Sequence, residues 1–598
     1  MRCGADTGGT FTDVVADDGR VAKVLSTPDD PSRGLREGLE ALDAVDTRPP
    51  ALAHGTTVAT NAVLERRGAR VALVTNDGMA DVIEIGRQDR PSLYDLWADR
   101  PEPLVPRDLR LEVTGRLDAT GTEVIPLDPA SLEPIPEQVE AVAVCLLHAD
   151  LNPDHEQAVA AFLQASGIDV TCSSEVAPEF REFERTVTTV VNAYLRPRCR
   201  SYLRSLSGLA DEVLVLTSAG GLVPAEEAAD LPVALLLSGP AGGVVAASAA
   251  AAAAGFPDAV TFDMGGTSTD VCLIQGGVPE PAATRIAAGF PIRLSALDIH
   301  TIGAGGGSIA RLDPGGALVV GPVSAGADPG PACYRRGGTD ATVTDADLLL
   351  GRIPPEATFP GLGTLDRGAA ATAMEATGVT PEGVVAVVDA NMERAVRAVT
   401  VERGIDPADL ALVAFGGAGP LHGCAIADAL GMKAVVVPPR AGVLSAVGLL
   451  CSSRQRDLVR SWAPGDPIEG LDAARRRLAD EVRAAVGGST DAEVETSLDC
   501  RYAGQSHELT VGSVEDFPGE HRRRNGYARP DAPIEVVAIR ARARLPAASS
   551  PADLGPPPGS AREATAGPTV LAEADCTVWV PEGWRADVAE DGSWVLTR

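Results

Sequence analysis

The chain has 598 residues, enough for three or four domains, and its 45% hydrophobic and 22% charged content is ordinary for a globular enzyme. Its formal net charge of −32 disfavours binding to nucleic acid or to an anionic membrane surface. The sequence has no signal-peptide pattern, no apolar stretch long enough to span a bilayer and no C-x-x-C pair among its ten cysteines, so we expect a cytoplasmic protein without disulfide bonds or a zinc site.

An eight-residue phrase occurs twice, as D-T-G-G-T-F-T-D at residues 6–13 and as D-M-G-G-T-S-T-D at residues 263–270. Apolar runs beside both copies predict that each is the tight turn of a β-hairpin. Glycines lack a Cβ, so backbone N–H groups can approach an anion, and the threonine hydroxyls add donors. The recurring residues are Asp6, Gly8, Gly9, Thr10, Thr12 and Asp13 in the first copy, and Asp263, Gly265, Gly266, Thr267, Thr269 and Asp270 in the second.

The carboxylates of the two phrases would repel a phosphate directly. They suit a phosphate site if Mg²⁺ lies between carboxylate and phosphate. We therefore expect the two hairpins to face each other as a nucleotide clamp, one from each half of a duplicated domain. The alternative is that D-x-G-G-T is only a common turn, since Asp and Gly favour turns. The repetition of Thr and of a second Asp in register favours the clamp.

Residues 1 to about 190 are expected to form a first α/β unit, with a helix that begins at Pro31 and strands at 71–75 and 141–147. The Arg-, Asp- and Pro-rich residues 87–117 form a long insertion of the kind that carries function. A polar segment at a loop-to-helix junction supplies candidate substrate residues, although a capping or turn role for its histidine is an equal alternative. These residues are His54, Thr56, Thr57 and Asn61.

Residues 180–195 have apolar residues at helical spacing, and Pro197 is predicted to end this helix. We interpret the polar face of this helix as solvent-exposed. The alternative is that one of its acidic side chains acts as a catalytic acid. That face consists of Arg181, Glu182, Glu184, Arg185 and Asn192.

A second unit begins near residue 211, and its segment 238–243 (S-G-P-A-G-G) opens an Ala-rich helix whose N-terminus is a plausible anion seat. Asp298 and His300 alternate on an extended segment before the glycine-rich residues 303–307. Both side chains could therefore face one metal or one substrate, but two candidate ligands alone do not define a metal site.

A third glycine turn follows the predicted strand 410–415 and precedes a helix that ends at Gly431; its glycines are Gly416, Gly417 and Gly419. Strand, glycine turn and helix together allow a flat adenine or ribose to lie on the backbone. The sequence has no G-K-[ST], and Ser308 stands where the third glycine of G-x-G-x-x-G would fall, so P-loop and Rossmann sites are excluded. From about residue 460 we expect a smaller β-containing module.

These segments resemble the signatures of the hydantoinase A/5-oxoprolinase family, which belongs with sugar kinases, heat-shock chaperone ATPases and actin. The matching segments occur in family order from residue 6 to about residue 545. They are D-T-G-G-T-F-T-D-V-V, H-G-T-T-V-A-T-N-A, S-G-P-A-G-G-V, F-D-M-G-G-T-S-T-D-V, H-T-I-G-A-G-G-G-S-I-A, A-D-P-G-P-A-C-Y, F-G-G-A-G-P-L-H and R-Y-A-G-Q-S-H-E-L.

The resemblance implies an α/β fold with duplicated actin-like (ribonuclease H-like) ATPase lobes at 1–195 and 196–455, and a smaller C-terminal module at 456–598. It implies ATP-dependent opening of a cyclic amide, of the hydantoin or 5-oxoproline type, together with a separate B-type subunit. The chemistry is reasonable because an unstrained lactam is a poor electrophile. Phosphorylation of its carbonyl oxygen would give an activated imidate that water can attack.

On this resemblance, Asp6 and Asp263 would orient Mg²⁺ and the attacking oxygen, with Asp13 and Asp270 beside them and a further divalent or monovalent cation possible. The threonines of the two phrases would hold the β- and γ-phosphates of ATP, and the third glycine turn would hold adenosine. The chain departs from the family at two places. Asp347 stands where Asn is usual, and the C-terminal module is shorter than is usual in the family around residues 550–566. That shortening puts the pairing with a partner subunit in question.

Two other functions fit the same motifs. Acetone carboxylase β-type subunits share them, so the substrate could be a ketone that is phosphorylated and then carboxylated. A non-enzymatic, ATP-switched assembly protein is the third hypothesis, and it predicts ATP turnover that ignores small cyclic amides.

Overall fold

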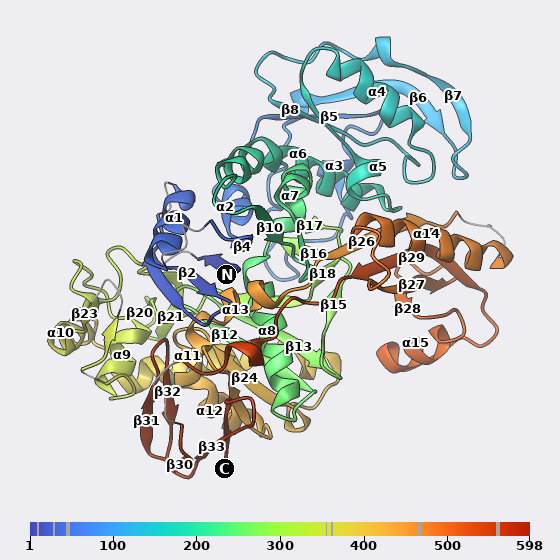
Figure 1. The fold of residues 1–598 in the computed structure, drawn as a ribbon. Coiled ribbons are helices and arrows are strands. Elements are labelled where there is room, and N and C mark those ends of the chain that lie inside the picture. The colour runs from blue at the N-terminus through green and yellow to red at the C-terminus, as the bar shows by residue number, and fades with distance from the viewer. Residues whose placement is uncertain are drawn as a thin grey trace.

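The computed structural model places the two hairpins in two separate mixed sheets (Figure 1). It describes residues 1–8, 11–27, 30–42, 48–354, 356–359, 363–463, 468–557 and 562–598. Within these residues no helix combines the length and the apolar character that crossing a membrane requires. All ten cysteines are free thiols, and nine of them are buried.

The first sheet has the strand order β11-β10-β4-β1-β2-β3. Strand β1 pairs antiparallel with β2 and parallel with β4, which in turn pairs parallel with β10. The predicted first hairpin is thus confirmed, and so is the helix from Pro31, α1 (Pro31–Ala41). The strand bounds are β1 Cys3–Thr7, β2 Phe11–Ala16, β3 Val21–Leu25, β4 Ala51–Thr56, β10 Glu212–Leu216 and β11 Leu222–Pro224.

The second sheet repeats this arrangement. Strand β12 pairs antiparallel with β13 and parallel with β24, which pairs parallel with β25. The order β14-β13-β12-β24-β25 therefore matches β3-β2-β1-β4-β10, and the second predicted hairpin is confirmed. The bounds are β12 Ala259–Met264, β13 Thr269–Gln275, β14 Val278–Pro279, β24 Ala411–Phe415 and β25 Val435–Val437.

Two further sheets flank this pair. The sheet β7-β6-β5-β8-β9 lies at the top of Figure 1 and contains the predicted strands as β5 (Val71–Asn76) and β8 (Ala141–Val144). Its other strands are β6 Arg110–Leu117, β7 Glu123–Asp128 and β9 Asp169–Cys172. The C-terminal sheet β26-β29-β27-β28 lies at the right of that view, with helix α14 (Leu471–Ala485) against it. Its strands are β26 Gln455–Ser461, β27 Glu493–Tyr502, β28 Leu509–Val511 and β29 Ile534–Arg544. The last strands, β33 (Arg585–Val588) and β34 (Trp594–Thr597), return to extend the second sheet beyond β25.

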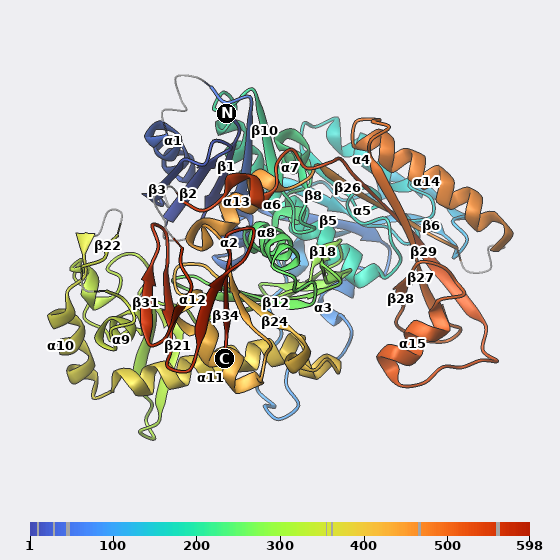
Figure 2. The same cartoon turned by 60° about the horizontal axis from the view of Figure 1, so that its bottom comes forward.

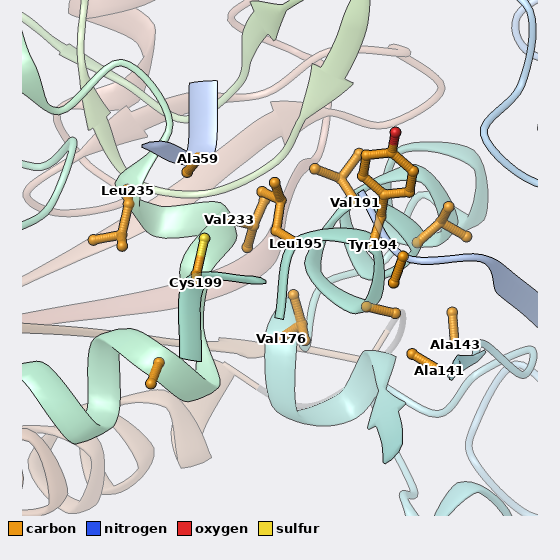
Figure 3. Close-up of a cluster of buried hydrophobic side chains, with 14 of the residues drawn as sticks. Ala59, Ala141, Ala143, Val176, Val191, Tyr194, Leu195, Cys199, Val233 and Leu235 are labelled. Atoms are coloured by element: carbon orange, nitrogen blue, oxygen red, sulfur yellow. The ribbon is translucent and has the colours of Figure 1, made fainter. Parts of the chain in front are cut away.

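Helix α6 (Glu182–Ser205) corrects the prediction that Pro197 ends it, because the helix continues through the proline. Proline removes one backbone hydrogen bond and costs about 3 kcal/mol inside a helix. Buried side chains on both sides of the proline offset that cost. In Figure 3 the α6 side chains Leu195 and Cys199 lie in one apolar cluster with Val233 and Leu235 of the short helix η3 (Pro232–Leu235).

The polar face of α6 is also less solvated than predicted. Arg185 and Asn192 are both fully buried. Arg185 pairs with Asp150 and donates a 2.8 Å hydrogen bond to the carbonyl of Leu146. Asn192 donates to the carbonyl of Asp230. Both side chains bind α6 to neighbouring segments, so α6 is a buried helix held by polar contacts as well as by apolar packing.

Helix α13 (Leu444–Cys451) connects the two large sheets (Figure 2). It crosses α8 (Gly239–Ala253) so closely that a Cβ on Gly448 would lie 1.8 Å from the carbonyl oxygen of Gly242. On its other side, a Cβ on Gly4 of β1 would lie 2.3 Å from the carbonyl oxygen of Ala446. Two glycines of the S-G-P-A-G-G segment, Gly242 and Gly243, are thus used for helix packing.

We expect Leu195→Ala, at the fully buried Leu195, to lower the free energy of unfolding by about 2–5 kcal/mol through lost burial and a residual cavity. Urea denaturation followed by tryptophan fluorescence measures this change. The matched control is Leu64→Ala at the end of α2 (Val58–Leu64), where the side chain is 60% exposed and the change should stay within about 0.5 kcal/mol. Equal losses in the two variants would contradict the proposed role of this cluster.

Candidate functional site

The two hairpins are built alike at the level of single hydrogen bonds. Asp6 is the register partner of Asp13, and Asp263 is the register partner of Asp270. Each turn is closed by a 3.0 Å bond, from the N–H of Gly8 to Phe11 in the first copy and from the N–H of Gly265 to Ser268 in the second. The candidate phosphate ligands Gly9 and Thr10 lie outside the described residues.

The carboxylates of the two hairpins lie close enough to act on one another. Burial raises the pKa of Asp263, and the carboxylates of Asp270, Asp6 and Asp13 raise it further. Burial and Asp13 raise the pKa of Asp6 to about 7, although Lys23 opposes the shift. Burial raises the pKa of Asp270 to about 6. Carboxylates from both sheets therefore share one crowded region between the hairpins.

Two residues that the sequence analysis missed support these carboxylates. Lys23 lies 2.6 Å from one oxygen of Asp13 and occupies its register position on β3. A usable signal existed, because Lys23 is one of only two lysines in a chain with 51 basic residues. On β19 (Ile299–Ile302), Thr301 donates a hydrogen bond to Asp270, its register partner.

The predicted pair Asp298 and His300 lies elsewhere. Side chains alternate along a strand, so Thr301 shares the face of Asp270 and His300 points to the other face. His300 is exposed, and Asp298 forms an ion pair with Arg403. The structure thus brings neither residue to the carboxylates of the hairpins.

The donor set between the hairpins fits Mg²⁺. Four crowded carboxylates face one ammonium group, and a divalent cation would offset their mutual repulsion. Mg²⁺ binds oxygen ligands and keeps several waters, so one or two carboxylates plus substrate phosphates suffice. In the part of the chain that the structure describes, no group of three or more His, Cys, Asp or Glu side chains could hold a metal by itself. Asp6 and Asp263 would accordingly supply only part of a coordination shell.

Two glycine segments pack against the second hairpin. Gly306 and Gly307 donate backbone hydrogen bonds of 3.0 and 2.7 Å to the carbonyls of Gly265 and Gly266. In the third glycine turn, Gly416 has a φ of 80°, and a Cβ there would lie 2.4 Å from a carboxylate oxygen of Asp263. Only glycine fits this position.

The other glycines of the third turn differ in surroundings. A Cβ on Gly419 would lie 3.1 Å from the carbonyl oxygen of Phe262, whereas a Cβ on Gly417 would meet no atom within 4 Å. The backbone of the turn at Gly417 therefore has free space beside it, next to the contact between Gly416 and Asp263.

The candidate threonines also differ from one another. Thr267 is exposed at the tip of the second hairpin. Thr269 is buried and donates to the carbonyl of Ala304, while the buried hydroxyl of Thr12 lies 3.2 Å from that of Ser26. Thr267 is thus the one of these three whose hydroxyl faces solvent.

His54 is buried on β4, where Nδ1 lies 3.1 Å from the carbonyl oxygen of Ala5 and Nε2 lies 2.8 Å from the hydroxyl of Tyr202. A carbonyl only accepts, so Nδ1 carries the proton and Nε2 accepts from Tyr202. Burial lowers the pKa of His54 to about 4, and the ring is neutral. His54 therefore links α6 to the strand that carries Asp6.

The neighbours of His54 lie nearer to the hairpin tip. Thr56 is buried as the register partner of Thr7 and accepts a hydrogen bond from the N–H of Val58. Thr57 precedes α2, and the exposed Asn61 lies one turn later, with its amide 3.4 Å from the Thr57 hydroxyl. Of the predicted substrate residues, Asn61 is therefore the exposed one on this segment.

A buried ion triad supports the helix that follows the third glycine turn, α12 (Gly419–Leu430). His422 lies 2.7 Å from Asp389 of α11 (Pro381–Val399) and 3.2 Å from Asp347 of α9 (Val343–Leu349). Burial lowers the pKa of His422, but the two carboxylates outweigh burial and raise it to about 10. The aspartate at 347, where the resembled family usually has Asn, thus helps to keep the imidazole charged.

Comparisons with known proteins identify the family of the chain. A model described as Hydantoinase/oxoprolinase N-terminal region matches residues 2–167, and a model described as Hydantoinase/oxoprolinase matches residues 185–457. Caprolactamase subunit alpha of Pseudomonas jessenii is 34% identical and covers 100% of this chain and 99% of its own. 5-Oxoprolinase 1 of Arabidopsis thaliana is 34% identical over 87% of this chain but only 48% of its own, so this chain spans about half of that relative.

Solved structures give the same picture. The crystal structure of ATP-dependent caprolactamase from Pseudomonas jessenii superposes with a TM-score of 0.85 at 31% identity and full coverage of both chains. A nucleotide-free acetone carboxylase structure superposes with a TM-score of 0.76, covering 100% of this chain and 99% of its own, but at 24% identity this likeness concerns the fold alone.

The crowded carboxylates predict an unusual pH dependence. Between its ordinary pKa near 4 and its raised value of about 7, Asp6 keeps a proton in the folded state that it loses on unfolding, so stability falls as pH rises through this window. We expect Asp6→Asn to raise the melting temperature of the ligand-free protein at pH 8 and to have a smaller effect near pH 4. Differential scanning calorimetry across this range measures the effect, with Asp77→Asn at an exposed site as the control. A gain that is independent of pH would contradict the carboxylate crowding.

The ion triad predicts a loss of stability in a higher pH range than the one for Asp6. The raised pKa of His422 contributes stability that is fully present below its unfolded value near 6.5 and is lost as pH rises through about 10. We expect His422→Gln to cost about 3 kcal/mol at pH 7, because it removes the cation between Asp347 and Asp389 and leaves the buried Asp347 with only Arg352, 3.4 Å away, as an ionic partner. Denaturant unfolding at pH 7 and pH 10.5 should show a smaller difference at the higher pH, whereas an equal difference would argue against a charged imidazole.

Proposed function

The chain belongs to the hydantoinase/oxoprolinase family, and on that premise we propose that it is the ATP-binding subunit of an enzyme that hydrolytically opens a cyclic amide. One observation carries the proposal: two matching hairpins, one from each large sheet, place Asp6 and Asp263 in one carboxylate-rich region. Such a region suits a polyphosphate with its metal ion and has no evident use in a purely structural protein.

The repeated strand order supports a description of the two sheets as duplicated actin-like, ribonuclease H-like lobes. We propose the lobes at 1–195 and 196–455 and the C-terminal module at 456–598. Strands cross these boundaries, since β10 and β11 complete the first sheet and β33 and β34 extend the second. The lobes are thus interlocked, which suits a nucleotide held between them.

In the proposed mechanism the side chains mainly position and neutralise charge. Asp6 and Asp263 would hold Mg²⁺, which would neutralise developing charge on the phosphates, with Asp13 and Asp270 as their neighbours across each hairpin. Backbone N–H groups and hydroxyls of the hairpin tips contact the phosphates. The proposed contacts are the exposed Thr267 and the tip residues Gly8, Gly9, Thr10, Gly265 and Gly266, whereas the buried Thr12 and Thr269 support the turns from behind.

Adenosine lies on the third glycine turn, Gly416 to Gly419, where the open backbone at Gly417 adjoins Asp263. On this proposal the carbonyl oxygen of the bound amide attacks the γ-phosphorus of ATP, and ADP leaves. Water then adds to the activated carbonyl carbon, the ring C–N bond breaks with a proton passing to nitrogen, and a second water releases inorganic phosphate from the resulting acyl phosphate. Holding the two reactants in line supplies most of the acceleration in such a transfer. Thr56, Thr57 and Asn61, beside the first hairpin, are the proposed substrate contacts.

A separate B-type subunit completes the proposed enzyme. The caprolactamase relative is named as an alpha subunit and matches this chain over nearly its whole length. The Arabidopsis 5-oxoprolinase is about twice as long, so it has room for the equivalent of a second subunit within one chain. The proposed location is the cytoplasm, because ATP is available there.

We expect Asp263→Asn to lower ATP turnover by at least about 10²-fold, since it removes a charge that holds the metal, while the protein stays folded. Phosphate release is measured with the partner subunit present, in the presence of 5-oxoproline, hydantoin, ε-caprolactam or acetone. The matched control, Glu402→Gln, lies at an exposed position and should keep the full rate.

The substrate panel separates the hypotheses. Stimulation by a cyclic amide supports the proposal, and stimulation by acetone with bicarbonate would instead indicate a ketone-activating enzyme. Turnover that is insensitive to every compound would indicate an ATP-switched assembly protein. A full rate in Asp263→Asn would refute the role given to this residue.

A further inference from the structure

A long irregular loop follows α3 (Val82–Ile85). Residues 86–106, between α3 and the short helix η1 (Arg107–Leu109), form no helix or strand. The insertion expected at residues 87–117 is therefore shorter in the structure, because residues 110–117 form β6. Irregular loops of this length are uncommon in compact proteins and usually carry function. The nucleotide region and the proposed substrate contacts make no use of this loop.

Four large apolar side chains of this loop face solvent. Leu93 and Leu96 are 75% and 80% exposed, and Tyr94 and Trp97 are 96% and 91% exposed. A single exposed leucine is common on a soluble protein, but here two leucines and two aromatic rings lie within five residues. Exposed apolar patches mark sites where another protein or a membrane binds.

Hydrogen bonds within the loop fix the backbone that carries these side chains. The hydroxyl of Ser92 accepts hydrogen bonds from the N–H groups of Tyr94 at 3.3 Å and Asp95 at 3.0 Å. The carboxylate of Asp95 accepts a 2.9 Å bond from the N–H of Trp97. The backbone is thus held in turns while the apolar side chains remain exposed. A partner would meet a preformed surface and would lose less conformational entropy on binding.

Both ends of the loop are attached to the body of the molecule. Arg100 donates to the carbonyls of Ile85 and Asp89, and Arg87 donates a 2.8 Å hydrogen bond to Glu184 of α6. Glu184 lines a polar cavity of about 320 Å³, whose wall also includes the exposed His507 of the C-terminal module. The loop therefore starts at the wall of this cavity.

The loop alone is too small for a complete interface. Two aromatic side chains bury about 150–250 Å² each. A standard interface buries about 800 Å² on each partner. A protein bound to the loop would therefore also cover surface around it, and the cavity at the base of the loop supplies polar surface for such contacts. Aromatic residues at the centre and polar residues at the rim are the usual composition of an interface.

The charge of the molecule argues against a second copy of this chain as the occupant. Residues 87–100 contain three arginines and three aspartates and are neutral overall, whereas the chain carries a formal charge of −32. Two copies would bring two strongly acidic molecules together, and a large net charge keeps proteins monomeric. The same charge disfavours an anionic membrane. A different polypeptide without this acidic excess meets no such repulsion.

We propose that residues 87–100 are the docking loop for the second subunit of the enzyme, a B-type polypeptide with an apolar pocket that takes Trp97 and Leu96. This inference rests on the proposed function, in which a B-type subunit completes the enzyme. Tryptophan and tyrosine side chains dominate the affinity of many interfaces, so Trp97 is the expected anchor. A subunit bound there would also cover the cavity beside Glu184.

The test measures binding of the full chain to the purified B-type subunit of the same organism by biolayer interferometry. We expect Trp97→Ala to weaken binding at least about thirtyfold and Leu96→Ala at least about fivefold, because each variant loses apolar contact with the pocket of the partner. Both variants should keep the wild-type melting temperature, since the two side chains are exposed.

Leu312→Ala, on β20 (Ser308–Leu312), is the matched control and should bind like the wild type. Leu312 is also exposed, and β20 lies at the left of Figure 1, well away from α3. A loss of binding in Leu312→Ala equal to that in Leu96→Ala would contradict a specific role of the loop.

Equal binding of the B-type subunit by Trp97→Ala and the wild type would overturn the docking loop and leave the proposed function intact. So would a wild-type chain that dimerises by itself, or binds neutral phosphatidylcholine vesicles, and loses this association in Trp97→Ala; the occupant would then be a second copy or a membrane. A complex that depends on Trp97 but whose phosphate release responds to no cyclic amide would support the docking loop and refute the proposed function alone.

Discussion

Mutual repulsion among four carboxylates is the constraint around which this chain is organised. Asp6 and Asp13 come from the first sheet and Asp263 and Asp270 from the second, and Lys23 offsets the charge of the first pair. Burial raises the pKa of Asp6, Asp263 and Asp270, and neighbouring carboxylates add to the shift for Asp6 and Asp263, so the ionised forms are disfavoured without a cation. The interlocked sheets, the buried α6 and the packed α13 hold in place a region that would otherwise separate. The free energy of unfolding is thus lowered by the carboxylates in the ligand-free protein, and binding of a metal ion and a polyphosphate to the folded state would raise it again.

The local parts of the site could be predicted from the sequence. Each hairpin follows from a glycine turn between apolar runs, and the turn length sets the register that opposes Asp6 to Asp13. The third glycine turn was predicted in the same way, because strand, glycines and helix follow one another along the chain. The positions of the glycines also carry information, since Gly416 has a backbone conformation and a close carboxylate contact that exclude other residues.

Partners distant in sequence could not be predicted in this way. Thr301 and Tyr202 contribute through strand register and helix packing, which no local pattern specifies. The prediction that Pro197 ends α6 failed because burial of Cys199 and Leu203 outweighs a missing hydrogen bond. The interpretation of Arg185 as solvated failed because a charge can be buried when a partner such as Asp150 is supplied from elsewhere.

The crossing of α8 and α13 restricts how the two hairpins can move relative to each other. At Gly242 and Gly448 the two backbones are in direct contact, because neither residue has a side chain that would lie between the helices. Sliding one helix along the other would drive neighbouring side chains into the opposite backbone. A change in the distance between Asp6 and Asp263 would therefore require the two sheets to rotate relative to each other about the crossing of α8 and α13. A single methyl group added at Gly448 would collide with the backbone of Gly242 and block this rotation.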